Sequence, residues 1–182
     1  MEFYEMDEGN RIRTVCKWVV DVVLVISFAW FLVYAFGTQV RVSGNSMQPA
    51  LNSGDVVLMN RLSCSLFGPG RMDVVVFAMD AREENIKRVV GLPGETVQIQ
   101  GGLIYIDGVA LENEDGLGQT ALAGLAQEPI SLGEDEYFLL GDNGGSSEDS
   151  RFSNVGNIKR EQIKGRVWLK ISPITDFGLV SG

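Results

Sequence analysis

Residues 18–36 read WVVDVVLVISFAWFLVYAF, and this run decides how the rest of the chain is organised. At about 1.5 Å of rise per residue, its helix would span roughly 28 Å, close to the hydrocarbon thickness of a bilayer. Its one charge, Asp21, lies three residues past Trp18, near enough to the headgroups that its cost is modest. The run predicts an N-terminal transmembrane helix at 18–36, followed by a separate domain at 37–182.

The charges around this run predict its orientation. Arg11, Arg13 and Lys17 precede it, whereas few charges follow it closely. Basic residues favour the cytoplasmic side of a membrane segment. We therefore expect a single-pass protein of the cell membrane, with residues 1–17 in the cytoplasm and residues 37–182 outside.

The run has two other interpretations. Val33-Tyr34-Ala35 weakly resembles the small-x-small site of a cleaved signal peptide, but the run exceeds the roughly 7–15 residues of a signal-peptide core. A buried core helix would carry a polar face, which this run lacks. We therefore favour a retained anchor.

Beyond the anchor, short β-branched and aromatic runs alternate with turn residues, which is typical of strands. The alternating segments 96–100 and 103–106 flank Gly101-Gly102 and predict a hairpin, and Asp107-Gly108 marks a second tight turn. The acidic, Gly- and Ala-rich segment 112–127 is interpreted as a surface excursion. One helical turn near 158–162 is the only helix predicted outside the anchor. Further strands are predicted at 56–59, 74–77, 87–90, 109–111, 137–140 and 166–171.

Composition limits the possible functions. The net charge of −9 disfavours nucleic acid as a partner, because phosphate binding needs a basic face. The chain has no histidine, and no cysteine spacing suggests a metal, so no metal or other cofactor is expected. Cys16 and Cys64 lie on opposite sides of the apolar run, so they cannot pair across a membrane.

The segment VSGNSMQPAL (residues 42–51) places Ser46 after a glycine, where serine is either a turn residue or a nucleophile. A nucleophilic serine needs a base, and without histidine a neutral lysine is the recognised substitute. Lys87 lies in the strand-like NIKRVVGLPGE, where apolar neighbours could lower its pKa by the roughly three units required. The alternative is a solvated edge lysine. The other lysines are Lys17, on the cytoplasmic side, and Lys159, Lys164 and Lys170, in a charged stretch expected to be exposed.

A third polar segment, GDNGGSSEDSRFSNVG at residues 141–156, follows an apolar strand and therefore predicts a loop at a sheet end. It is either a solvated acidic loop or part of a site. Together these blocks, with RMDVVVF and GRVWLKISP, resemble the bacterial type I signal peptidases over nearly the whole chain from about Lys17. The resemblance implies a signal-peptidase/LexA-like antiparallel β-sheet catalytic domain, mainly β, preceded by one N-terminal transmembrane α-helix.

The resemblance also implies a role for each matching residue. Ser46 would be the nucleophile, Lys87 the general base and Ser147 the hydroxyl that orients the lysine amine. Gly44 stands where some members carry an oxyanion-hole serine. Asp149 would pair with Arg151, Asp142 would pair with Arg88, and substrate pockets for small side chains would be formed by Val42, Met47, Leu51 and Ile86.

The implied activity is that of a serine endopeptidase that removes signal peptides from secretory preproteins after small-x-small sites. Its partners would be those preproteins and the lipid bilayer, and the sequence leaves the oligomeric state open. Two rivals are a soluble serine–lysine self-cleaving regulator, which the anchor and acidic charge disfavour, and a non-catalytic anchored β-module.

Overall fold

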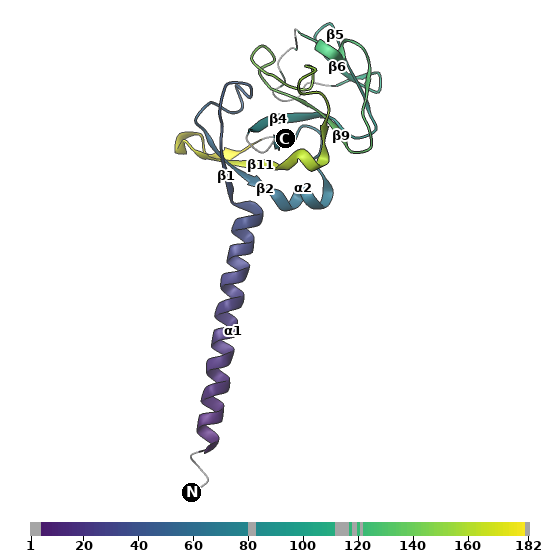
Figure 1. Cartoon of the computed structure of the whole chain (residues 1–182). Helices are drawn as coiled ribbons and strands as arrows, with labels where there is room; N and C mark the ends of the chain where they lie inside the picture. Colours follow the sequence, from purple (N-terminus) through teal and green to yellow (C-terminus); the bar gives the residue numbers. More distant parts are fainter. Residues whose placement is uncertain (1–4, 80–82, 112–116, 118–119, 121, 181–182) are drawn as a thin grey trace.

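The computed structural model describes residues 5–79, 83–111, 117, 120 and 122–180, and it shows a long helix that leads into a β domain (Figure 1). Helix α1 comprises Glu5–Phe36, so it begins well before the predicted segment 18–36 and includes much of the predicted N-terminal segment. Its stretch Asn10–Phe36 is long and apolar enough to cross a membrane by length and composition.

Strands in the described residues form two sheets in which every pairing is antiparallel. The larger sheet has the order β1-β2-β11-β3-β4-β9-β10, with β12 paired to β11. Its strands are β1 (Thr38–Arg41), β2 (Val56–Asn60), β3 (Val74–Ala78), β4 (Glu84–Gly91), β9 (Glu136–Leu140), β10 (Ile158–Lys159), β11 (Ile163–Ser172) and β12 (Gly178–Leu179). The predicted fold class, mainly β with one N-terminal apolar helix, is confirmed.

The smaller sheet has four strands in the order β7-β6-β5-β8. The predicted hairpin is present, with Gln100 opposite Leu103, and the glycines between them have φ angles of 58° and 84° that favour this residue type. The strands are β5 (Thr96–Gln100), β6 (Leu103–Ile106), β7 (Val109–Ala110) and β8 (Ile130–Ser131).

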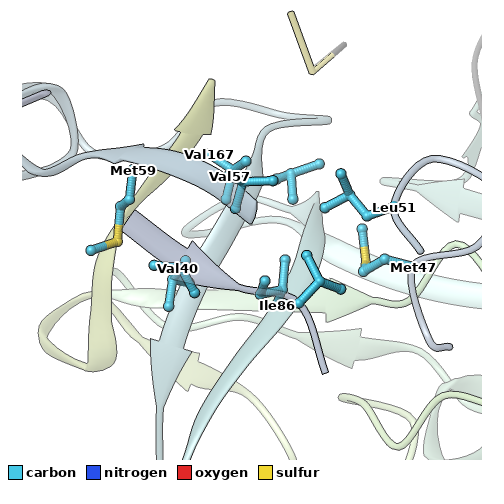
Figure 2. Close-up of a cluster of buried hydrophobic side chains, with 10 residues drawn as sticks. Val40, Met47, Leu51, Val57, Met59, Ile86 and Val167 are labelled. Carbon is cyan, nitrogen blue, oxygen red and sulfur yellow. The ribbon is translucent and has the colours of Figure 1, made fainter. Parts of the chain in front are cut away.

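A buried apolar cluster is formed by side chains of β1, β2, β3, β4 and β11 of the larger sheet (Figure 2). Alternate residues of these strands, such as Val40 and Ile86, point into the cluster, and Met47 and Leu51 join it from the loop between β1 and β2. This loop is therefore attached to the sheet by its own buried side chains, which gives the segment around Ser46 a fixed position.

Three sequence interpretations need correction. Helix α2 (Arg61–Phe67) was not predicted; its N-cap is Asn60, whose side chain accepts a hydrogen bond from the Ser63 N–H. Segment 112–127 lies partly outside the described residues, but its described residues Leu117, Thr120 and Ala126 are buried, so it is more than a surface excursion. In the predicted exposed stretch, Lys170 instead has only 12% of its side chain exposed and forms an ion pair with Asp55.

The remaining single-turn helices are η1 (Gly124–Gln127), η2 (Arg160–Gln162) and η3 (Ile174–Asp176). Helix η2 falls within the turn predicted near 158–162. Cys16 and Cys64 are both free, as their separation predicted.

Candidate active site

Ser46 lies in the loop between β1 and β2. The sequence allowed two roles for this serine, a turn residue or a nucleophile. The ends of this loop are joined by hydrogen bonds from the Val42 N–H to the Asp55 carbonyl and from the Gly54 N–H to the Val42 carbonyl. Met47, the residue after the serine, is 1% exposed, and its N-terminal neighbour Ser46 is half-buried at the surface above it. The buried neighbour therefore fixes the backbone that carries the serine hydroxyl.

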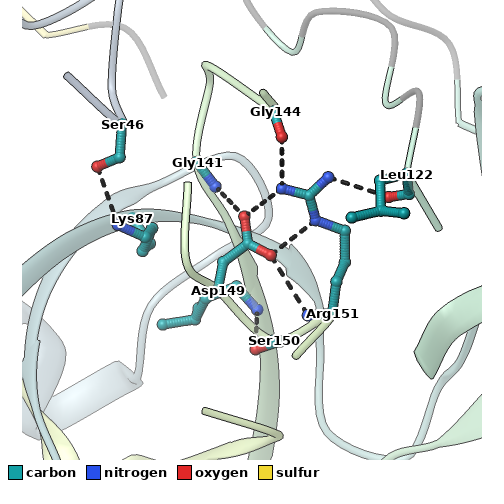
Figure 3. A network of polar contacts seen from close by, with 9 residues as sticks. Ser46, Lys87, Leu122, Gly141, Gly144, Asp149, Ser150 and Arg151 are labelled. Carbon is teal, nitrogen blue, oxygen red and sulfur yellow. Dashed lines mark hydrogen bonds and ion pairs between the residues drawn. The ribbon is translucent and has the colours of Figure 1, made fainter. Parts of the chain in front are cut away.

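Lys87 lies on β4, opposite Val75 of β3, and it meets Ser46 directly. Its Nζ is 2.9 Å from the Ser46 Oγ, although the two residues are 41 positions apart in the chain (Figure 3). A hydrogen bond of this length is the contact that a serine needs with the group that removes its proton. The structure thus brings together the two residues that the sequence selected as a candidate pair.

Burial lowers the pKa of Lys87 below its ordinary value, because a charged ammonium loses solvation when its side chain is only 3% exposed. Asp149, Glu148 and Asp142 oppose this shift, whereas the Arg151 guanidinium adds to it. Val89 and Val75 pack together in one buried apolar cluster beside β4, and Ile86 belongs to another. The strand therefore supplies the apolar surroundings that favour a neutral lysine.

The loop after β9 is fixed by two buried ion pairs. Asp142 accepts hydrogen bonds from the Arg88 Nε and Nη2, both at 2.8 Å, and Asp149 accepts from the Arg151 Nε and Nη2 at 2.7 Å and 2.8 Å. Both pairings that the resemblance implies are present. Arg151 also donates to the carbonyls of Leu122 and Gly144, so its guanidinium joins this loop to the segment that carries Leu122 (Figure 3).

This loop also holds the serine segment in place through the main chain. The Asn143 N–H donates to the Ser46 carbonyl at 2.9 Å, and the Asn143 side-chain amide donates to the Asn45 carbonyl. Gly141 must be glycine here, because a Cβ atom would lie 2.2 Å from the Ser147 Oγ and 2.6 Å from the Ser46 carbonyl oxygen. Both partners of Asn143 are backbone carbonyls of the serine segment, and no residue pattern in the sequence reveals such contacts.

Ser147 is 6% exposed and lies against the serine segment, yet its Oγ has no hydrogen-bond partner in the described structure. The bond to the Lys87 amine that the resemblance implies is therefore not formed in this conformation. A buried hydroxyl without a partner is unusual, because leaving such a group unsatisfied costs free energy. Its place beside Ser46 keeps Ser147 a candidate member of the site.

A groove of about 190 Å³ opens at the serine, between β1 with the residues after it and the first half of β4. Val42, Met47 and Ile86 line it as predicted, together with Val40, which the sequence did not select. Leu51 does not line it, because this side chain is fully buried in the cluster beneath. The polar lining comes from Gln39, Arg41, Ser43, Ser46, Glu84, Asn85 and Lys87.

Gly44, two residues before the serine, has a φ of +82°, a backbone conformation that side-chain-bearing residues rarely adopt. Space around its missing side chain is open, since a Cβ would meet no atom within 4 Å. The loop therefore tolerates a side chain sterically at this position but disfavours one conformationally. Within the described part of the chain, no group of three or more Cys, Asp or Glu side chains is arranged to hold a metal ion.

A long apolar helix joined to a β domain that carries a serine and a buried lysine in one groove is the arrangement expected of a membrane-associated serine hydrolase. Comparison with known proteins gives the family. The model of the family described as signal peptidase, peptidase S26, matches residues 15–171. The chain therefore belongs to the signal peptidase family, and it is a type I signal peptidase, a serine peptidase that removes signal peptides from secretory preproteins.

Two individual relatives agree with this assignment. A signal peptidase I of Bacillus caldolyticus is 32% identical over 171 residues, which cover 88% of this chain and 91% of the relative. A probable signal peptidase I-2 of Synechocystis sp. is 29% identical over 170 residues, covering 90% and 74%. The crystal structure of a signal peptidase I from Enterococcus faecalis V583 aligns with 54% of this chain and 95% of its own, at 30% identity and a TM-score of 0.44.

Proposed function

We propose that this peptidase cuts its substrates with Ser46 as the nucleophile and Lys87 as the general base, through an acyl-enzyme. The observation that carries this proposal is the 2.9 Å contact between the Lys87 Nζ and the Ser46 Oγ in a chain that has no histidine. The lowered pKa of Lys87 supports it, because only a neutral amine can accept the serine proton.

In this mechanism Lys87 takes the proton from the Ser46 hydroxyl while the oxygen attacks the scissile carbonyl. The negative charge that develops on the carbonyl oxygen is stabilised by the Ser46 backbone N–H, since glycine at position 44 offers no hydroxyl. Lys87 then returns the proton to the leaving amine. Water then attacks the acyl carbonyl while Lys87 takes its proton, and Lys87 returns that proton to the Ser46 oxygen as the bond to the acyl group breaks.

The groove favours a substrate bound as an extended strand. Strand β1 is at one end of the sheet order and pairs only with β2 in the described structure, so one of its edges is open beside the groove. A peptide added there would form main-chain hydrogen bonds and direct alternate side chains inward, toward Val42, Met47 and Ile86. These buried side chains leave little depth, which supports selection of small residues at alternate positions, as in Ala-x-Ala.

This specificity predicts where cleavage occurs. The detergent-solubilised full chain, incubated with a mixed set of precursors, should cut after small-x-small sites, and mass spectrometry of the products maps each cut. A matched precursor with leucine in place of the alanine before the scissile bond should be cut about a hundredfold more slowly, because overpacking a buried pocket costs roughly 1–3 kcal/mol. Equal rates for the two precursors would contradict the pocket assignment.

We also propose that residues 1–17 face the cytoplasm and the β domain lies outside, as the basic residues before the anchor predict. A protease added to intact cells should then digest the β domain, whereas the same domain should survive if it faced the cytoplasm. Digestion only after the membrane has been permeabilised would reverse the orientation.

Replacing Ser147 with alanine is expected to slow cleavage by up to about 10²-fold without abolishing it, because a misplaced catalytic group costs a rate factor of this size. The melting temperature should stay the same or rise, since the Ser147 Oγ has no partner to lose. Ser146→Ala, an exposed neighbour in the same loop, is the matched control. An unchanged rate in Ser147→Ala would leave Ser147 without a role in catalysis.

A further inference from the structure

Helix α2 ends in two adjacent apolar side chains that no other part of the described chain covers. Leu66 is 61% exposed and Phe67 is 83% exposed. Single exposed apolar residues are common on soluble surfaces, but two neighbouring large ones at the end of a short helix require an explanation. The position of α2 relative to the anchor provides it.

Helix α2 lies beside the end of the anchor helix. The Arg61 guanidinium at its first turn is 5.6 Å from the centre of the Tyr34 ring in the last turns of α1. Figure 1 shows α2 on the side of the β domain that α1 enters, lying across the direction of α1. The junction is also closed by the Trp168 indole, which donates a hydrogen bond to the Phe36 carbonyl. Where α1 leaves the membrane, α2 therefore lies at about the level of the lipid headgroups.

The surface next to α2 is less acidic than the chain as a whole. A hollow of about 460 Å³ is lined by three basic residues and two acidic ones, so its local charge is +1, whereas the whole chain carries −9. Apolar side chains beside basic ones are typical of helices that lie in the membrane interface. The charged residues are Arg61, Asp135, Arg160, Glu161 and Lys164.

We propose that α2 binds the surface of the bilayer that holds α1, with Leu66 and Phe67 inserted among the headgroups and the adjacent acyl chains. The β domain is then attached to the membrane at two places, the end of α1 and the end of α2. Two attachments fix the tilt of the domain relative to the bilayer, whereas the anchor alone would let the domain tilt together with α1. The groove, which begins at Gln39 just after the anchor, is thereby held at a constant height where a signal peptide leaves the membrane.

The insertion can be measured directly with a tryptophan at position 67. Phe67→Trp and Val109→Trp are each made in a full chain that also carries Trp18→Phe and Trp30→Phe, which removes the intramembrane tryptophans. Val109 is 71% exposed on β7 of the smaller sheet and is the matched control. In proteoliposomes of brominated phosphatidylcholine, the added emission of Phe67→Trp should be quenched and that of Val109→Trp should not. If the emission of the two variants is equally unquenched, the proposal is overturned. Blue-shifted but unquenched emission of Phe67→Trp also overturns it, because it indicates that a protein partner covers position 67.

The functional consequence requires a second experiment, which depends on the family activity but not on the assignment of Ser46 and Lys87. The double substitution Leu66→Ser/Phe67→Ser should lower kcat/KM about tenfold for a membrane-embedded precursor and leave that for a short soluble peptide unchanged. Leu103→Ser/Val109→Ser, exposed on the smaller sheet, should change neither value. Unchanged cleavage of the embedded precursor, or an equal loss on both substrates, would overturn the role of α2 in positioning the groove.

Discussion

Replacing Ser46 with alanine is expected to lower kcat/KM for precursor cleavage by about 10⁴-fold or more, the size of loss seen when a serine nucleophile is removed. The reason is local, because the hydroxyl is the atom that Lys87 contacts at 2.9 Å and the atom that would attack the substrate. The fold should be unaffected. The Asn143 N–H donates to the Ser46 carbonyl, which alanine retains, and the side chain that fixes this loop to the core is the neighbouring Met47.

The measurement is the initial cleavage rate of the purified full chain in detergent, with circular dichroism as the check on folding. Ser53→Ala is a matched control, because Ser53 belongs to the same loop and is exposed away from the groove. It should cleave at the unsubstituted rate. Full activity in Ser46→Ala would contradict the assignment of the nucleophile. The assignment requires a variant that is inactive and still has the circular dichroism spectrum of the folded enzyme.

The sequence predicted the β-rich domain because its strands carry strong local signals. The segment 96–106 alternates apolar and polar residues around two glycines, and this pattern specifies both the strands and the turn. Helix α2 had no comparable signal, because its seven residues make fewer than two full turns and cannot show a helical period. Its one local indication was Asn60, a preferred N-cap residue followed by no Gly or Pro until position 68.

The sequence predicted Ser46 and Lys87 as a candidate pair by elimination and by motif, but it could not predict how the two side chains meet. Ser46 follows β1 and Lys87 lies on β4, and in the sheet these strands are separated by β2, β11 and β3. Their side chains meet because β1 itself lies across the groove from the first half of β4, and the buried Met47 and Leu51 fix the loop that follows β1. Pairing between distant strands depends on the order of the whole sheet, which no single segment encodes.

The same limit explains the errors. Leu51 was placed in a substrate pocket because it matches a motif position, whereas its side chain fills the core beneath the groove. Lys170 was expected to be exposed because charged neighbours surround it in sequence, yet β11 brings it to the buried carboxylate of Asp55. The environment of Lys170 is set by Asp55, which lies 115 positions earlier in the chain. The environment of Leu51 is set by the packing of its own loop against the sheet.

Lys87→Met is expected to abolish cleavage as fully as Ser46→Ala, since a pair that acts as a unit loses nearly everything when either member is removed. Methionine is close in length and apolar, so it should fill the space between the β3 and β4 side chains without creating a cavity. In the unsubstituted enzyme, kcat/KM should rise with pH through the lowered pKa of Lys87, because the neutral amine is the active form. Residual activity with the same pH profile in Lys87→Met would show that another group is the base.

The same substitution should change stability in the opposite direction from activity. The pKa of Lys87 in the folded state lies below the 10.5 of an unfolded lysine, so between these two values the unfolded chain binds more protons than the folded one. Stability of the unsubstituted enzyme therefore rises with pH across this window and is reduced below it. Lys87→Met removes that term, so its melting temperature near pH 7 should be higher and should rise less toward pH 10, measured by thermal denaturation in detergent. An equal pH dependence in both chains would mean that the lysine is charged when folded, which is incompatible with its role as the base. The expected result, a higher melting temperature in the inactive variant, would show that the enzyme is less stable because it keeps a neutral lysine beside its serine.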